Sequence, residues 1–359
     1  MGFIMRKFNV CVVGLGMIGE IHVKALSELR KEGYVDTIGV LTSSPAKADY
    51  YKNTYGCKTY MSLNEVAKDN MIDVVVIATP HYLHHGQAML LMEYGKHVIV
   101  EKPIAINITA AKEMISKAKK KGVRLGVVFQ HRYADDVKLL KEYIDEGVMG
   151  DIHYIQGEVM WWREESAYYL KDEVARSWRG MWSTEGGGAM INQAIHIVDL
   201  IQWFSCSVAE EVYGYIDNLM HPSINVEDMG IALIKFRGKT YASISASLCT
   251  RPPSYQYTKI KIFGSKGLAE LHNDELRILK SDSGIDIDKI STPASETLRV
   301  QHELHARLLK DFLIALREDR DFPINGEEGL KSLEIVRALY ISSTIKQPVK
   351  LPLHPQIIA

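Results

Sequence analysis

Three glycines follow the first apolar run of the chain at a regular spacing. Gly14, Gly16 and Gly19 form Gly-x-Gly-x-x-Gly directly after the run 8–13 and at the start of an amphipathic stretch. In such a motif the first glycine makes a tight turn, the second lets a pyrophosphate approach the backbone, and the third lets a helix pack on the strand. The helix amino terminus adds a positive field. Glycines alone could form a simple turn, but strand, spacing and helix agree, so we predict a dinucleotide site.

The residues after the next apolar run, 37–41, bear on which dinucleotide is bound. A carboxylate at this place would accept a hydrogen bond from the ribose 2′-hydroxyl and would repel a 2′-phosphate. This chain has Thr42, Ser43 and Ser44 instead, with Lys47 close behind. Hydroxyls and a lysine tolerate a 2′-phosphate, so we predict NADP as the preferred cofactor. NAD stays open, because Ser44 could merely cap the next helix and no arginine is present to clamp the phosphate.

Three histidines, His81, His84 and His85, lie within five residues after the apolar run 73–78. Histidine is the commonest metal ligand in proteins, so a metal site has to be considered. His81 and His84 would need a third ligand of matching placement, and the neighbouring sequence supplies none. We therefore predict no metal.

Lys102 stands directly before Pro103, just after the apolar run 97–100. The proline ring fixes its own backbone angle and restricts Lys102 to an extended conformation, which constrains the direction of its ammonium group. Open α/β sheets bind ligands at the carboxyl ends of their strands. We expect this lysine to lie at that edge.

The first third of the chain alternates apolar runs with amphipathic stretches, as a parallel sheet with crossover helices requires. Strands are expected at 8–13, 37–41, 73–78, 97–100 and 124–129. Helices are indicated by the apolar face of residues 18–29, by Ser44-Pro45, by the capping box Ser62-x-x-Glu65, and by the stretches 83–94 and 109–121, the last ended by Gly122.

After about residue 130 the pattern changes to extended runs joined by short glycine turns, as antiparallel neighbours require. Strands are expected at 152–160, 211–216, 229–236, 241–248, 257–263, 267–271 and 276–280, and helices at 136–146, 188–204, 301–317 and 326–345. We therefore predict an α/β domain with a parallel sheet over residues 1–129 and an α+β domain with a mainly antiparallel sheet over residues 130–359.

The composition fits such a two-domain protein and excludes other classes. The 359 residues carry 43 Lys+Arg and 44 Asp+Glu, so no basic field exists that could hold a nucleic acid. The four cysteines form no C-x-x-C pair, which fits a reducing compartment. No apolar run approaches the roughly 20 residues of a membrane span, and the first residues lack the order of a signal peptide. We expect a cytoplasmic protein with neither nucleic-acid nor membrane partners.

Further motifs, taken in order with those above, resemble one family along essentially the whole chain. They are Gly14-Leu15-Gly16-Met17-Ile18-Gly19 with His22, Ala78-Thr79-Pro80 with His84, Glu101-Lys102-Pro103, Phe129-Gln130-His131-Arg132-Tyr133, Trp178-Arg179-Gly180, and Gly186-Gly187-Gly188-Ala189-Met190-Ile191-Asn192-Gln193-Ala194-Ile195-His196. The sequence resembles the glucose-fructose oxidoreductase and inositol dehydrogenase family, Gfo/Idh/MocA. That resemblance implies a Rossmann domain plus a domain with a large open-faced, mainly antiparallel sheet, which binds substrate and joins subunits into a homodimer or homotetramer.

The resemblance also implies catalytic residues. The family's catalytic lysine matches Lys102, and the histidine of its Asp-x-x-x-His motif matches His196, whereas Asn192 stands at the aspartate position. Four residues apart on a helix, Asn192 and His196 would project from the same face. Oxidation of a secondary alcohol needs a base for the hydroxyl proton, which an imidazole can supply near neutral pH, and a lysine beside a cationic ring has a depressed pKa. The alternative for His196 is a histidine packed in a core.

The motifs and the resemblance together give a set of expected binding residues. We expect the cofactor to contact Gly14, Gly16, Met17, Ile18, Gly19, Thr42, Ser43, Ser44, Lys47, Thr79, Pro80, His81, His84, Glu101, Lys102 and Gln130. We expect the substrate to contact Lys102, Arg132, Trp178, Arg179, Asn192 and His196. Aromatic and basic residues within 161–182 offer platforms for sugar C–H faces and donors for hydroxyls, although an aromatic-packed loop or an oligomer contact explains them equally well.

These observations predict an NAD(P)-dependent dehydrogenase that exchanges a hydride between nicotinamide and a secondary alcohol or ketone of a sugar, sugar nucleotide or cyclic polyol. One alternative is a reductase of the same family that acts on a dihydrodiol, a bile pigment or an imine. Another is a non-enzymatic dinucleotide-binding regulator. Such a regulator would be expected to lose the catalytic lysine and histidine, so the presence of Lys102 and His196 favours an enzyme.

Overall fold

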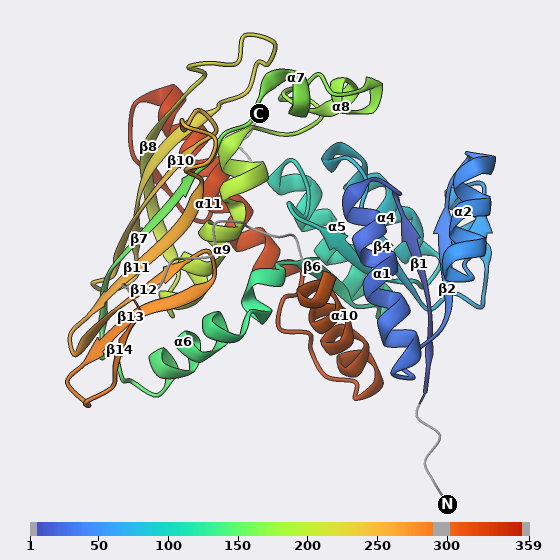
Figure 1. Cartoon of the computed structure of the whole chain (residues 1–359), viewed down its shortest axis with the longest axis horizontal. Coiled ribbons are helices and arrows are strands. Elements are labelled where there is room, and N and C mark those ends of the chain that lie inside the picture. Colours follow the sequence, from blue (N-terminus) through green and yellow to red (C-terminus); the bar gives the residue numbers. More distant parts are fainter. Residues whose placement is uncertain (1–5, 290–301, 354–359) are drawn as a thin grey trace, which may run out of the picture. The chain divides into compact units, whose positions relative to one another are not determined.

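The computed structural model describes residues 6–289 and 302–353 of the chain, which divides into two units (Figure 1). The first unit comprises residues 1–130 and 300–330, and the second comprises residues 131–299 and 331–359. The expected division at 129/130 therefore lies one residue from the observed one, and residues 300–330, expected in the second domain, are grouped with the first unit. Gln301, the expected start of a helix, lies outside the described residues.

Six parallel strands form the sheet of the first unit, in the order β3-β2-β1-β4-β5-β6. They are β1 (Phe8–Val13), β2 (Val35–Leu41), β3 (Lys58–Tyr60), β4 (Val74–Ile77), β5 (His97–Glu101) and β6 (Leu125–Val128). All four residues of β4 are buried, because helices cover both faces of a parallel sheet. This strand order is that of a Rossmann domain, so the predicted fold of this part is confirmed.

The helices of the first unit lie where the sequence indicates, with small differences at their ends. They are α1 (Met17–Lys31), α2 (Pro45–Tyr55), α3 (Leu63–Lys68), α4 (His84–Glu93), α5 (Ile108–Lys121) and α10 (His302–Arg317), with a short 3₁₀ turn η1 (His81–Leu83). Ser44 Oγ accepts from Lys47 N at 3.4 Å at the start of α2. Gly122 ends α5 with a φ of +65°, in the left-handed conformation that glycine adopts readily.

Contacts with α1 and β6 explain why residues 300–330 belong to the first unit. Helix α10 packs against α1, and beyond α10 the chain runs beside β6, where Val127 N donates to Ile324 O at 2.9 Å. A Cβ on Gly126 of β6 would lie only 3.0 Å from the ring of Phe312 and 3.1 Å from that of Phe322. The close packing of α10 on β6 therefore favours a glycine there.

Nine strands form the sheet of the second unit, in the order β14-β13-β12-β11-β7-β10-β9-β8-β15. They are β7 (Ile152–Met160), β8 (Ala209–Asp217), β9 (Met229–Phe236), β10 (Tyr241–Ser247), β11 (Tyr257–Gly264), β12 (Gly267–His272), β13 (Glu275–Ser281), β14 (Asp286–Asp288) and β15 (Val349–Lys350). Neighbouring strands are antiparallel except for β7 and β10, which pair in parallel. The predicted mainly antiparallel sheet is confirmed.

One face of this sheet is covered by helices. The helical segments of the unit are η2 (Gln130–Tyr133), α6 (Asp135–Asp145), α7 (Glu165–Tyr168), α8 (Glu173–Trp178), η3 (Ala189–Ala194), α9 (Ile195–Phe204) and α11 (Gly326–Ile345), of which η2 and α11 span the boundary with the first unit. A Cβ on Gly157 of β7 would lie 2.7 Å from Ile201 and 2.8 Å from Ile197 of α9. Among the described helices, none is long and apolar enough to cross a membrane.

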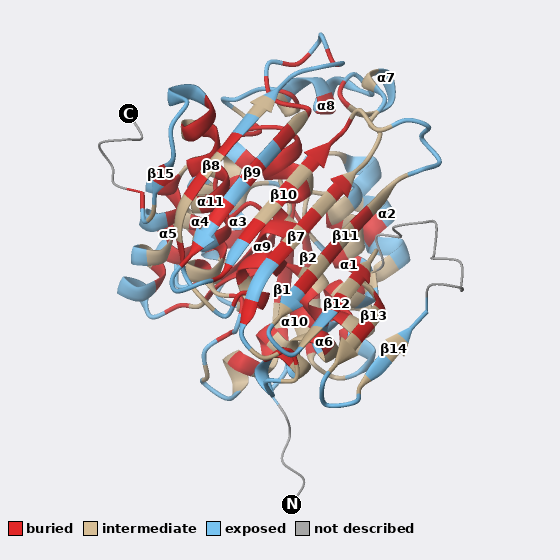
Figure 2. Ribbon diagram, turned by 90° about the vertical axis from the view of Figure 1, so that its left-hand side faces the viewer, coloured by how far each residue is buried: buried red, intermediate tan, exposed pale blue. Residues whose placement is uncertain are grey.

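Within the described part of the chain, the other face of the sheet is open. Along β9, Ala232 and Ile234 are buried, whereas Ile231 and Leu233 between them are 48% and 58% exposed. Tyr241 on the neighbouring strand β10 is 52% exposed. Figure 2 shows the same alternation of buried and exposed residues along the strands. The open-faced sheet expected from the resemblance is present.

Candidate functional site

The glycine turn after β1 has the shape that a bound pyrophosphate requires. Gly14 has a φ of +97°, and a Cβ on it would lie 2.5 Å from Ala78 O, while a Cβ on Gly19 would lie 1.8 Å from Gly14 O. A Cβ on Gly16, in contrast, would meet nothing within 4 Å. Gly16 is also the residue that precedes α1, and it has no side chain with which to cap that helix. The first and third glycines therefore satisfy close packing, and the second leaves open backbone at a helix amino terminus, which fits a dinucleotide.

The residues after β2 place a cation beside this turn. Lys47 Nζ donates to Leu15 O of the turn at 3.3 Å. Thr42 Oγ1 accepts from Ser44 N at 3.1 Å, and Ser44 caps α2 as described above, so both hydroxyls already have local partners. Ser43 is exposed. Of the expected residues here, Ser43 and Lys47 are thus the ones most available to a ribose or its phosphate, and Ser44 has the capping role that the alternative interpretation gave it.

His84 joins the loops that follow β4 and β5. Its Nδ1 lies 2.9 Å from Pro103 O and its Nε2 lies 3.0 Å from Thr79 O. Burial lowers the pKa of His84, so the ring is neutral near pH 7 and donates to one of the two carbonyls. Both ring nitrogens thus contact backbone carbonyl oxygens, so His84 links the two loops. The sequence had instead suggested that His84 contacts the cofactor directly. Thr79 itself donates from Oγ1 to Gln87 Oε1 at 2.8 Å.

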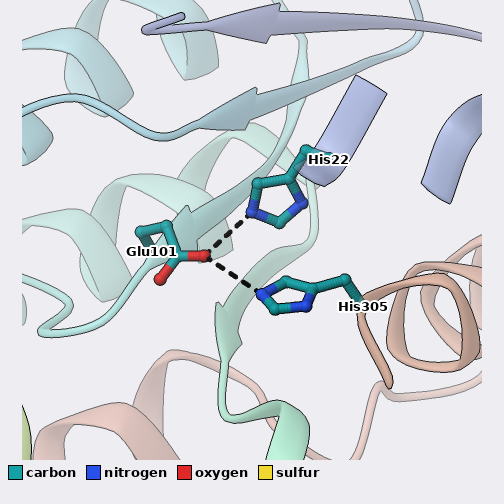
Figure 3. Close-up of side chains that lie close together, drawn as sticks. All are labelled: His22, Glu101 and His305. Carbon is teal, nitrogen blue, oxygen red and sulfur yellow. Dashed lines mark hydrogen bonds and ion pairs between the residues drawn. The ribbon is translucent and has the colours of Figure 1, made fainter. Parts of the chain in front are cut away.

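Glu101 lies between two buried histidines at the end of β5 (Figure 3). Its Oε1 lies 2.9 Å from Nε2 of His22 on α1 and 3.8 Å from Nε2 of His305 on α10. Burial raises the pKa of Glu101, but the hydrogen bond from His22 and the nearby positive groups outweigh burial, so its pKa lies below the usual value. The other carboxylate oxygen accepts from Lys102 N at 3.2 Å. This cluster therefore fixes the backbone at Lys102.

The donor atoms of His22, Glu101 and His305 lie within 4.8 Å of one another and could in principle hold a metal ion. Two ligands about 2.1 Å from a tetrahedral ion lie roughly 3.4 Å apart. The observed 2.9 Å between His22 Nε2 and Glu101 Oε1 is shorter and is typical of a direct hydrogen bond. We interpret the group as a hydrogen-bonded cluster, and the absence of a metal stays a prediction.

The remaining cofactor residues expected from the sequence also lie at this edge of the first unit. Lys102 is half-buried directly after β5, and His81 is 5% exposed in η1. Gln130 follows β6, and its Oε1 is buried without a hydrogen-bond partner among the described residues. Met17 is 69% exposed beside the glycine turn. An unpartnered buried amide oxygen and an exposed apolar side chain at one sheet edge are compatible with a bound cofactor.

Asn192 in the second unit contacts a buried carboxyl group. Its Nδ2 donates to Glu185 Oε1 and, at 3.1 Å, to Tyr168 Oη. Glu185 is 1% exposed and also accepts from Gly180 N. Burial raises the pKa of Glu185 to about 7, against the opposing effect of these hydrogen bonds. A buried carboxyl group therefore lies in hydrogen-bond contact with Asn192, the residue at the family motif's aspartate position.

His196 lies beside a second histidine that has an acidic partner. The rings of His131 and His196 meet edge-on with centroids 4.6 Å apart. His131 Nδ1 in turn pairs with the Asp274 carboxylate. Asn192 lies in η3, which is a turn of π-helix, and His196 lies in the α-helix α9 that continues it. The expected single helix over 188–204 is thus present with a wider first turn.

Arg132 is a correction to the expected site. Its Nε donates to Asp199 Oδ2 at 2.7 Å and its Nη2 donates to Asp199 Oδ1 at 2.6 Å, with the arginine 5% exposed. Ser332 also donates to Asp199, at 3.3 Å, and the guanidinium lies 5.1 Å from the ring of Trp203. The two-pronged ion pair commits Arg132 to the core of the second unit, so we assign it a structural role in place of a substrate contact.

The aromatic and basic segment keeps Arg179 and Trp178 together. Arg179 Cζ lies 5.4 Å from the ring centroid of Trp178 and 4.2 Å from that of Tyr168, the tyrosine that accepts from Asn192. Arg179 and Asn192 therefore both contact Tyr168, whereas Arg132 is paired with Asp199. Sequence reasoning missed Glu185, although an acidic residue just before a glycine turn is a usable signal.

Two domain models match this chain. Residues 8–129 match an oxidoreductase family with an NAD-binding Rossmann fold, and residues 137–270 match the GFO/IDH/MocA C-terminal domain. The chain belongs to the Gfo/Idh/MocA family. The family predicted from the motifs is thereby confirmed, and so is the prediction of a nicotinamide-dependent oxidoreductase.

Known Gfo/Idh/MocA proteins resemble this chain over nearly its whole length. Myo-inositol 2-dehydrogenase of Thermotoga maritima is 25% identical over 353 residues, which cover 96% of this chain and 98% of that protein. Glucose-6-phosphate 3-dehydrogenase of Bacillus subtilis is 21% identical over 365 residues, with coverages of 97% and 99%. The crystal structure of the WlbA dehydrogenase from Bordetella pertussis in complex with NADH and UDP-GlcNAcA is 29% identical, with a TM-score of 0.84 and coverages of 97% and 100%.

Proposed function

We propose that this chain is a dehydrogenase that transfers a hydride between NAD(P) and a secondary alcohol or ketone of a sugar, sugar nucleotide or cyclic polyol. The observation that carries the proposal is the glycine turn, which is closely packed at Gly14 and Gly19 and open at Gly16. Lys102 follows another strand of the same sheet and lies at the same edge. In this proposal the first unit binds the dinucleotide and the second binds the substrate. Relatives named for inositol, glucose 6-phosphate and UDP-GlcNAcA support the substrate class.

A bound nicotinamide would accept the hydride during alcohol oxidation, and a residue of the chain must accept the hydroxyl proton. We assign the role of base to His196, because imidazole is the side chain best suited to take up a proton near neutral pH. Lys102, whose backbone is fixed by Glu101, would hold the substrate oxygen with its ammonium group. Asn192, whose amide is oriented by Glu185 and Tyr168, would position the substrate or His196.

We propose NADP as the preferred cofactor and NAD as the alternative. Lys47 places a positive charge beside the glycine turn, and residues 42–44 include no acid that would repel a 2′-phosphate. The WlbA structure with bound NADH supports NAD as the alternative.

The open face of the second sheet supports a proposal of self-association. Ile231, Leu233 and Tyr215 are each about half exposed on neighbouring strands, and Leu233 lies opposite Tyr213 in the register of β8 and β9. Exposed apolar patches of this kind mark interfaces. We expect a homodimer or homotetramer with two-fold symmetry.

Turnover of a panel of sugars, sugar nucleotides and inositols with NAD and with NADP tests the proposed activity. On a substrate that the wild type oxidises, His196→Ala and Lys102→Ala should each lower kcat by roughly 10²-fold to 10⁴-fold, with little change in dinucleotide Kd. His85→Ala is the control, because His85 is a partly exposed histidine paired with Glu113. Near-normal turnover in both site variants, with dinucleotide bound, would contradict the assigned proton chemistry.

A further inference from the structure

Two arginines of the second unit converge on one tyrosine ring. Arg179 Cζ lies 4.2 Å from the ring centroid of Tyr168, and Arg163 Cζ lies 5.4 Å from the same centroid. Arg163 also lies 4.6 Å from the ring of Trp161. All four side chains are only partly exposed. Two positive charges are therefore held close together on an aromatic surface.

These arginines have only neutral acceptors. Arg163 Nη1 donates to Trp162 O at 3.1 Å and to Gln256 Oε1 at 3.4 Å. Arg179 Nη1 donates to Tyr168 O at 2.9 Å. Over residues 6–289 and 302–353, neither guanidinium forms an ion pair with a carboxylate, and Arg179 Nε and Trp161 Nε1 are buried without an acceptor. Burial, together with the charge of Arg179, lowers the pKa of Arg163.

This arrangement differs from that of the structural arginine in the same unit. Arg132 is buried and forms a two-pronged ion pair with Asp199. The acid near Arg179 is Glu185, which accepts instead from Gly180 N and Asn192 Nδ2. Both guanidinium groups are partly buried, and Glu185 interacts electrostatically with Arg179 without forming an ion pair. A bound anion would offset the repulsion between these two partly desolvated cations.

The position of the pair connects it to the proposed catalytic helix. Tyr168 Oη accepts from Asn192 Nδ2 at 3.1 Å and from Gln193 Nε2 at 2.8 Å, and both residues lie in η3. Since both amides donate to this oxygen, the tyrosine retains its own proton for donation. Donors from Arg163, Arg179, Trp161 and Tyr168 therefore gather next to η3.

We propose that Arg163 and Arg179 bind a compact oxyanion of the substrate, a carboxylate or a phosphate, so that the enzyme acts on an acidic sugar derivative in preference to a neutral polyol. The planar guanidinium matches either group with two parallel hydrogen bonds. This inference rests on the proposed function, because it names the substrate class of the same site.

Ligand binding to the dinucleotide-loaded protein tests the inference without requiring turnover. The probes are glucose, glucuronate and glucose 6-phosphate, which share a ring and differ in charge. Trp161 and Trp178 lie against the arginines, so tryptophan fluorescence should report binding, and calorimetry gives an independent Kd. We expect at least one anionic ligand to bind tenfold or more tightly than glucose. A preference for glucuronate identifies a carboxylate site, and a preference for glucose 6-phosphate identifies a phosphate site.

Arginine variants separate anion binding from a packing role. Arg179→Gln and Arg163→Gln should each weaken binding of the preferred anionic ligand by roughly 10-fold to 100-fold, and should weaken glucose binding much less. Arg179→Lys keeps the charge but loses the planar group, so its affinity for the anionic ligand should lie between those of the wild type and Arg179→Gln. Arg176→Gln in α8, the helix that ends just before Arg179, is the control, because Arg176 is exposed. Binding of no anionic probe, or an unchanged anion preference in Arg179→Gln, overturns the inference. Dinucleotide binding is measured on the same samples, and its absence would instead count against the proposed function.

Discussion

Replacing Asn192 by aspartate would put two carboxyl groups in contact inside the second unit. The Asn192 amide now donates to Glu185 Oε1. In Asn192→Asp an oxygen takes the place of that donor, and Glu185 is 1% exposed, so water cannot separate the two groups. Like charges about 4 Å apart repel by about 4 kcal/mol at an effective dielectric constant of 20, which corresponds to about 3 pKa units. The pair should therefore retain one shared proton well above pH 7.

The direction of the effect on stability follows from proton counting. Burial already raises the pKa of Glu185 to about 7, whereas a glutamate in the unfolded chain releases its proton near pH 4.3. The folded wild type holds the extra proton, so this group's contribution to the unfolding free energy falls between about pH 4.3 and 7 and then levels off. In Asn192→Asp the fall should continue above pH 7, at up to about 1.4 kcal/mol per pH unit. The variant should thus lose about 2–3 kcal/mol more than the wild type between pH 7 and 9.

Urea unfolding at pH 7 and pH 9 measures this difference. All five tryptophans lie between residues 161 and 203, so their fluorescence reports on the second unit. The double variant Asn192→Asp with Glu185→Gln is the control, because the glutamine amide can donate to the new carboxylate and should remove the additional pH dependence. If Asn192→Asp alone loses no more stability than the wild type between these pH values, the contact between residues 185 and 192 is not the buried carboxyl site described here.

Three further outcomes are expected. Ser43→Asp should shift cofactor preference from NADP toward NAD by roughly tenfold or more in the ratio of Kd values, because a carboxylate repels the 2′-phosphate. The same ratio of Kd values in wild type and variant would refute this prediction. Arg132→Met should lower the unfolding free energy by about 3–5 kcal/mol, and adding Asp199→Leu should recover most of that loss, as urea unfolding will show. Leu233→Asp should convert an oligomer to a monomer in light scattering, and a wild type that is already monomeric at micromolar concentration would exclude the proposed interface.

Elements with strong periodicity were predicted closely from the sequence. The ranges of β1, β7 and β9 agree with the structure residue for residue, because each has either a continuous or an alternating apolar pattern. Short elements were missed: β3 has three residues, β15 has two, and α7 has four. Such segments are too short to show a period, and their neighbours in space determine them.

In the candidate site, too, features set by neighbouring residues in the sequence were predictable, and features set by residues far apart in the sequence were not. The glycine turn is local, and its predicted packing is present at Gly14 and Gly19. The partners of Arg132 and Glu101 are not local: Asp199 is 67 residues from Arg132, and His305 lies on a helix that the sequence order suggested for the other domain. An arginine beside a motif could equally bind a substrate or an internal carboxylate, and the fold alone decides between them.

The triple-glycine turn before η3 shows why a motif can be recognised before its purpose is understood. A Cβ on Gly188 would lie 1.9 Å from Glu227 O, and one on Gly187 would lie 2.2 Å from Tyr340 Oη. Glycines are needed at these two positions because Glu227 and Tyr340 leave no room for a side chain. The Glu227 carboxylate accepts from Gly188 N at 2.8 Å, from Met190 N at 2.9 Å and from Tyr340 Oη at 2.7 Å, so it holds the first turn of the helix. A buried acid outside the motif therefore holds the start of the π-helical turn that carries Asn192.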